Sequence, residues 1–391
     1  MNRLLRTGFD TFVTSITPIA IWFLLGVLID RNLINIFTLI YPVQFIISSI
    51  RSIFGVGANI SAIRDKTKES VFSGIICGAT LGFIILGYII LNIDKYINFM
   101  NMDSNIYRTF AIYAVAQMFL QLLLNLSLCK LYYENKHKIA NKCSFTFNLI
   151  NFLSLIIMSI ITKNQIQITI ISFIITAIFV LIIMFKTIEK TKFKINVLSC
   201  IKYDSAYLFA EISMFIIYLF GFKNSFDFGE KYILAISFST LITDTQWDIS
   251  NAVITVAQID IAKNVFSYKE HIKNSKKLIC GLIGTSIVMG AILYPIYNVD
   301  IKATLIITGI ELMSMYMYPI YITKLTYIQI EHSALKATIH KQISNFIRII
   351  CSFILLPFCT SIGLAFSVVY QLITTSIIIN KNKINMEMRK A

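Results

Sequence analysis

A succession of long apolar stretches constrains the fold of this chain more than any motif does. A helix rises about 1.5 Å per residue, so about 20 apolar residues cross the roughly 30 Å hydrocarbon core of a bilayer. Twelve such stretches can be marked, at about 11–29, 33–61, 71–93, 107–129, 138–161, 165–185, 203–222, 231–257, 278–298, 303–323, 335–358 and 361–380. The sequence therefore predicts an all-α, polytopic membrane protein with about twelve transmembrane helices.

The composition agrees with a membrane protein. The chain is 57% hydrophobic and only 14% charged, whereas a soluble domain is about 25% charged. Its net charge of +15 comes from Lys and Arg that gather in alternate connections, such as 64–68, 130–142 and 263–277. By the positive-inside rule these connections are cytoplasmic. We therefore expect a multi-pass protein of the plasma or inner membrane with both termini cytoplasmic, in contact with lipid and not with nucleic acid.

The sequence also repeats itself at long range. An A-x-x-D-x-x-K stretch opens at Ala62 and again at Ala257, 195 positions later. Further residues recur 194 positions on without gaps: the pairs are Lys130 and Lys324, Tyr133 and Tyr327, Ala140 and Ala334, Lys142 and Lys336, Asn151 and Asn345, and Phe152 and Phe346. We therefore predict two six-helix halves, 1–195 and 196–391. An even number of spans per half makes this a parallel internal repeat, which in transporters places the binding site between the halves.

One stretch resembles a known family. The sequence F-G-V-G-A-N-I-S-A-I-R-D-K, from Phe54 to Lys66, resembles the glycine-rich second helix and basic turn of the multidrug and toxic compound extrusion (MATE) family, and 250–263 resembles its eighth helix. The resemblance implies a transporter of the wider multidrug/oligosaccharidyl-lipid/polysaccharide flippase superfamily. The chain departs from the family in being short and in the contracted spacing of its first-helix proline and acid, for which Pro18 and Asp30 are the nearest match.

Acidic residues deep in the predicted spans are the candidates for ion coupling. Glu211 in the seventh span and Glu311 in the tenth are each about eight residues from a span end, which is roughly 12 Å deep. Asp244 lies in the eighth span. A buried acid costs about 2.5–3.5 kcal/mol on insertion scales, so each requires a reason. Packing as a protonated or hydrogen-bonded residue is one reason, and binding a coupling ion is the other.

The resemblance favours ion coupling for the two glutamates. Some MATE members bind their coupling cation through acids on the seventh and tenth helices, which Glu211 and Glu311 match in helix and depth. Two neighbouring carboxyls can share one proton or hold a transient Na⁺. We predict H⁺ or Na⁺ as the coupling ion, no other cofactor and no fixed metal site.

Further polar and soft side chains within the spans are candidates for a substrate cavity. Met315 and Tyr316 suit a pliable wall for organic cations, although such residues also pack between helices. Arg348, beside Asn345 in the eleventh span, could meet a negative group such as a pyrophosphate. Gln117 and Asn151, the repeat partners of Glu311 and Asn345, complete the set.

Two functions remain open at this point. The first is efflux of amphiphilic, cationic organic compounds in exchange for H⁺ or Na⁺ by alternating access. The alternative is a flippase for a lipid-linked oligosaccharide or another polysaccharide precursor, which would require a cationic cavity. An enzyme is not expected, because every predicted loop is short and a catalytic cluster at the membrane face usually needs a substantial loop. The chain has no G-x-x-x-x-G-K loop, so we expect no nucleotide partner.

Overall fold

The computed structural model is helical throughout the part of the chain that it describes. That part comprises residues 4, 17, 19–64, 69–134, 136–187, 197, 200, 205–250, 252–262 and 265–382. Eight helical segments within it are long and apolar enough to cross a membrane: Arg31–Ala62, Glu69–Leu91, Ser104–Leu131, Lys138–Ile161, Gln165–Thr187, Tyr268–Tyr297, Ile301–His332 and Cys359–Lys381. The prediction of an all-α, multi-pass membrane protein is confirmed.

The other four predicted spans appear as helices that are shorter or more polar. Of 11–29, residues 11–16 and 18 lie outside the described residues, and the described part contains the short apolar helix Ile19–Leu28. The next three correspond to α10 (Ser205–Phe226), to α11 (Glu230–Ser250) with α12 (Ala252–Ala262), and to α15 (Ala334–Ser352). α15 ends six residues before the predicted 358. Pro357, which lacks an N–H and disfavours the helical conformation of the residue before it, lies in the irregular segment that follows.

The chain packs as two compact units. The first unit is Ala20–Leu219, and the second is Phe220–Ala391 together with Met1–Ile19. The division falls inside α10, so Glu211 belongs to the first unit. The predicted boundary between the two sequence repeats, at 195 and 196, differs from this division into compact units and stays a prediction.

In the first unit a long central helix, α6 (Ser104–Tyr133), gathers the others around it. It packs against α2 (Asn35–Arg51), α4 (Glu69–Leu91) and α8 (Gln165–Thr187), while α7 (His137–Ile161) packs against α8. Leucines of α6 form the core with Phe147 and Val180. The shorter elements are a 3-10 helix at Arg31–Ile34, a π-helix at Ser52–Gly57, α3 (Ala58–Arg64) and α5 (Ile93–Phe99).

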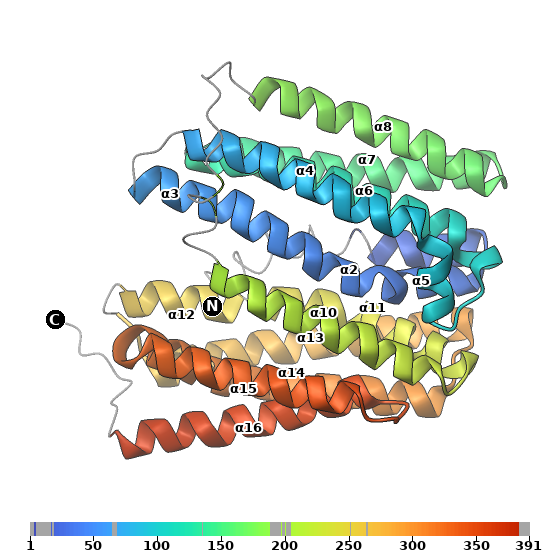
Figure 1. Cartoon of the computed structure of the whole chain (residues 1–391). Helices are drawn as coiled ribbons and strands as arrows, with labels where there is room; N and C mark the ends of the chain where they lie inside the picture. Colours follow the sequence, from blue (N-terminus) through green and yellow to red (C-terminus); the bar gives the residue numbers. More distant parts are fainter. Residues whose placement is uncertain are drawn as a thin grey trace. The chain divides into compact units, whose positions relative to one another are not determined.

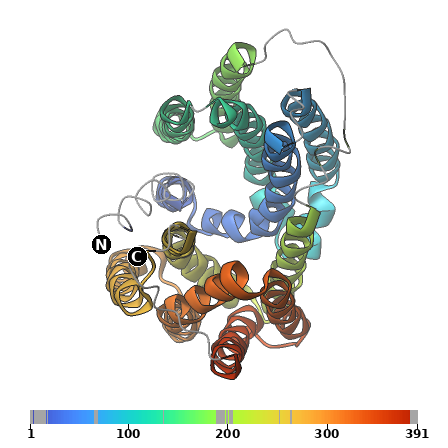
Figure 2. The same cartoon turned by 90° about the vertical axis from the view of Figure 1, so that its left-hand side faces the viewer.

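The second unit has the same plan. Its central helix α14 (Ile301–Tyr327) packs against α11, α12, α13 (Tyr268–Tyr297) and α16 (Cys359–Lys381), and α15 packs against α16. The helices of each unit run side by side in Figure 1 and are seen nearly end-on in Figure 2. Both ends of α16 lie 194 positions after the ends of α8, and α14 ends 194 positions after α6. The offset of the sequence repeat is therefore also the offset of the helix ends.

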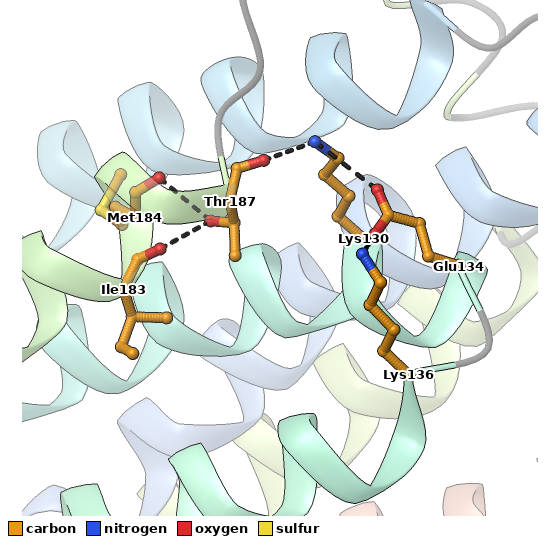
Figure 3. A network of polar contacts seen from close by, with 6 residues as sticks. All are labelled: Lys130, Glu134, Lys136, Ile183, Met184 and Thr187. Carbon is orange, nitrogen blue, oxygen red and sulfur yellow. Dashed lines mark hydrogen bonds and ion pairs between the residues drawn. The ribbon is translucent and has the colours of Figure 1, made fainter.

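The repeated lysines occupy equivalent places. Lys130 at the end of α6 donates a hydrogen bond to the backbone oxygen of Thr187 at the end of α8, at 2.5 Å (Figure 3). Lys324 at the end of α14 donates to the Ser376 hydroxyl on α16, at 2.9 Å. In each unit, one lysine thus connects the end of the central helix to the second helix after it in the chain, α8 or α16.

Glu134 extends the first of these ties. Lys136 Nζ lies 2.7 Å from one oxygen of the Glu134 carboxylate and Lys130 Nζ lies 3.7 Å from the other (Figure 3). The hydrogen bond from Lys136 and the charges of both lysines hold the pKa of Glu134 below its usual range. The carboxylate is therefore stabilised in its charged form in the folded protein.

We expect Glu134→Gln to lower the unfolding temperature slightly at neutral pH, because such partly exposed ion pairs contribute about 0.2–1 kcal/mol. The pKa of Glu134 is lower in the folded protein than the ordinary value of about 4.3. The contribution of Glu134 to the free energy of unfolding is therefore present above that pH and is lost as the pH falls through the folded-state pKa. The difference in unfolding temperature between the two proteins should disappear in acid. A difference that is constant with pH would contradict this account.

A close backbone approach fixes α4 against the π-helix of the first unit. A Cβ on Gly74 would lie 2.0 Å from the backbone oxygen of Phe54, whereas a Cβ on Gly87 of the same helix would meet none of the described atoms within 4 Å. We expect Gly74→Ala to reduce the free energy of unfolding by about 1–3 kcal/mol through overpacking. Gly87→Ala is the matched control and should leave the unfolding temperature unchanged or raise it. Equal effects of the two substitutions would show that α4 does not depend on this approach.

Candidate functional site

Four helices of the second unit converge on the carboxyl group of Glu311. Glu311 lies on α14 and is partly buried. It accepts a hydrogen bond from the Thr243 hydroxyl on α11. Ser361 on α16 faces the same carboxyl, and Arg348 on α15 is close enough for its charge to act on it. The site therefore contains a carboxyl group, a permanently charged guanidinium group and two hydroxyl groups.

Arg348 reaches this site because α15 and α16 approach closely. A Cβ on Gly363 of α16 would lie 3.0 Å from the Cys351 Cβ on α15, which is tighter than ordinary contact, so glycine favours the close approach of the two helices. The charge of Arg348 also acts on the Tyr321 hydroxyl of α14. A cation within a span is costly unless an opposite charge compensates it. Glu311 lies within range of the Arg348 charge, so the structure brings together two residues that the sequence had assigned to different roles.

Glu211 occupies a different environment, in the first unit. It is buried on α10 and lines a cavity of ≈ 360 Å³ whose other walls come from α2, the π-helix and α4. Apart from Ser49, the residues that share this cavity are apolar, among them Phe45, Ile53 and Phe215. Because Glu211 and Glu311 belong to different units, their pairing at one ion site stays a prediction.

Gln117 and Asn151 are joined by a chain of hydrogen bonds in the first unit. Gln117 Nε2 on α6 donates to the Tyr113 hydroxyl at 3.0 Å and to Thr176 Oγ1 on α8 at 2.7 Å. The Tyr113 hydroxyl donates to Asn151 Oδ1 on α7 at 2.5 Å. Sequence reasoning had missed Tyr113 and Thr176. Tyr113 could have been found, because it lies four residues before Gln117 and therefore on the same helix face.

The two units differ at this repeated position. Gln117 and Glu311 are repeat partners, and each is bonded to a hydroxyl of a neighbouring helix. Asn345, the repeat partner of Asn151, is buried, whereas Asn151 is partly buried. However, the counterpart of Tyr113 is Ile307, which has no hydroxyl to donate. The first unit therefore holds a neutral network where the second holds a titratable acid.

Comparison with known proteins then identifies the fold. No protein-family model and no curated protein matches the chain. Among solved structures, an inward-facing multidrug resistance MATE family transporter of the MOP superfamily is 13% identical, with a TM-score of 0.68 over 95% of each chain. An outward-facing structure of a multidrug resistance MATE family transporter of the MOP superfamily is 14% identical to this chain, with a TM-score of 0.62. A MATE in the straight conformation is 15% identical, with a TM-score of 0.61. Each of these two alignments covers 97% of this chain and 96% of the other. This chain has the fold of the MATE transporters. The resemblance noted in the second helix is thereby confirmed at the level of the fold.

The remaining candidates, Met315, Tyr316 and Asp244, lie in different environments of the second unit. Met315 is fully buried in the core of the second unit, and Tyr316 is exposed with Lys276 Nζ 5.1 Å from the centre of its ring. Asp244 is partly buried on α11, next in the chain to Thr243. Their roles in ion coupling or substrate binding stay predictions. Within the described ranges no group of three His, Cys, Asp or Glu is arranged to hold a metal ion.

The hydrogen-bond chain generates a prediction for the first unit. Tyr113→Phe removes the donor to Asn151 Oδ1, and a buried acceptor left unsatisfied costs about 1–3 kcal/mol. We expect a lower unfolding temperature of the purified protein. Tyr88→Phe, on the exposed face of α4, is the matched control and should have no effect. If both variants unfold at the wild-type temperature, the chain does not hold α6 to α7.

Proposed function

We propose that the protein is a secondary active transporter, not an enzyme, that exports amphiphilic, cationic organic compounds in exchange for H⁺ or Na⁺ by alternating access. It would lie in the plasma or inner membrane with both termini in the cytoplasm. The likeness to MATE multidrug transporters supports this proposal. The observation that carries it is the convergence of four helices on the Glu311 carboxyl.

Ion binding at Glu311 would change the hydrogen bonding and the charge interactions between these helices. As a carboxylate, Glu311 accepts the Thr243 hydrogen bond and offsets the charge of Arg348. As a neutral acid it no longer offsets that charge, so the arrangement of α11, α14 and α15 depends on the proton. Carboxylate and hydroxyl oxygens are also ligands for hard cations, which is how Na⁺ could act here. An ion that binds one conformation more tightly shifts the transporter toward it, and substrate affinity changes by the same factor.

The flippase remains the second candidate because of Arg348. A guanidinium group within a span can bind a pyrophosphate through paired hydrogen bonds. In this structure, however, Arg348 lies close enough to the Glu311 carboxyl for the two charges to interact. A flippase would require that charge to be available to the substrate, so the arrangement favours efflux.

The test compares two substitutions of glutamate by glutamine in proteoliposomes. Glu311→Gln keeps the size of the side chain and removes its titratable charge. We expect it to abolish efflux of a cationic dye driven by a pH or Na⁺ gradient and to remove the pH or Na⁺ dependence of dye affinity. Glu331→Gln, at an exposed site beyond α14, is the matched control and should transport normally. Glu211→Gln tests the proposed second acid in the same assay.

Two outcomes would count against this function. Normal gradient-driven transport by Glu311→Gln would remove Glu311 from the coupling mechanism. Binding of a lipid pyrophosphate that Arg348→Gln abolishes, without any dye transport by the wild type, would favour the flippase.

A further inference from the structure

A groove opens on the surface of the second unit, between α11, α13 and α14. Its volume is ≈ 510 Å³, within the roughly 300–1,000 Å³ of small-molecule sites. Its walls are mostly apolar and include Ile287, Ala291 and Tyr294 of α13 and Leu305, Gly309 and Leu312 of α14. Ile287 and Leu305 are 59% and 66% exposed, so the groove is open to the medium around the helix bundle. For a membrane-spanning helix that medium is hydrocarbon.

The groove runs lengthwise along α14. Its lining residues extend from Ile301 to Leu312, which is roughly 16 Å of helix at 1.5 Å per residue. It begins beside the short connection between α13 and α14, at a membrane surface, and ends about halfway along α14. A groove of this length covers about half of the hydrocarbon thickness.

Two buried hydroxyl groups line the groove. Thr304 lies near its surface end and Ser286 lies at its deep end, and they are only 8% and 1% exposed. Neither hydroxyl oxygen has a hydrogen-bond partner in the described part of the chain. A buried hydroxyl without a partner is unfavourable, so an occupant with an acceptor at the surface end would stabilise Thr304. The exposed Lys302 at the same end adds a positive charge.

We propose that this groove binds one acyl chain of a membrane phospholipid. A rotation of the Thr304 side chain toward the groove lets its covered hydroxyl donate to the ester carbonyl, the ammonium group of Lys302 faces the phosphate, and the hydrocarbon extends along α13 and α14. The hydrocarbon of the lipid offers no hydrogen-bond partner to Ser286, so the hydroxyl groups of Thr304 and Ser286 should differ in their effect on lipid binding. Ile242 and Leu312 of the groove wall are adjacent in the chain to Thr243 and Glu311. A bound lipid would thus support the α11–α14 contact that carries the Glu311 site, yet its binding does not depend on any transport activity.

Photocrosslinking tests this proposal directly. The intact protein is reconstituted with a phospholipid that carries a diazirine on its acyl chain, irradiated and digested, and the adducts are located by mass spectrometry. We expect adducts to concentrate on the groove residues of α13 and α14. Gly309→Leu fills the groove, and a Cβ at Gly309 meets no described atom within 4 Å, so the variant should fold. Adducts should then fall by roughly tenfold, which corresponds to about 1.4 kcal/mol.

Matched variants separate this site from general contact with lipid. Gly284→Leu adds the same side chain at an equally open position of α13 outside the groove, and should keep the adducts. Thr304→Val should reduce them, while Ser286→Ala should not. Adducts spread evenly over the exposed helices, or unchanged in Gly309→Leu, would overturn the proposal. Loss of adducts together with a dimer crosslinked through α13 and α14 would overturn it in favour of a second copy of the chain.

Discussion

The lack of water in the hydrocarbon core is the constraint on which the rest of this structure depends. Backbone N–H and C=O groups must find partners within the protein, and helices satisfy them within one segment. Helix packing then cannot rely on expulsion of water, because lipid is as apolar as leucine. It relies instead on close approach and on a few polar side chains. Gly74 against Phe54 and Gln117 with its two hydroxyl partners are examples of each.

The two central helices show how a repeated plan can acquire one functional difference. α6 and α14 occupy the same place in their units, and each has a lysine at its end bonded to the second helix after it in the chain. Halfway along, α6 carries an amide and α14 an acid. The amide makes neutral hydrogen bonds that do not change with pH. The acid has two protonation states, and with Arg348 beside it these states differ in how well the local charges compensate.

The proposed ion site and the proposed lipid site lie on opposite sides of one contact. Thr243 and Glu311 join α11 to α14, and the residues next to them in the chain form the inner wall of the groove. For an ion to shift the equilibrium between conformations through this hydrogen bond, the contact between α11 and α14 must be well packed. The two helices must nevertheless be able to move relative to each other. Lipid packed along α13 and α14 would supply part of that support.

The sequence by itself determined the helical membrane fold and the offset of the repeat. These depend on hydrophobic length and on residues matched at fixed spacing, both of which are local properties of the chain. The sequence could not show that α15 ends at Ser352, nor that Arg348 lies close to Glu311, nor that Tyr113 connects Gln117 to Asn151. Such pairs lie on different helices, or depend on which face of a helix meets its neighbour. Only tertiary packing decides those contacts, because an apolar helix has many faces of similar hydrophobicity and its sequence does not select among them.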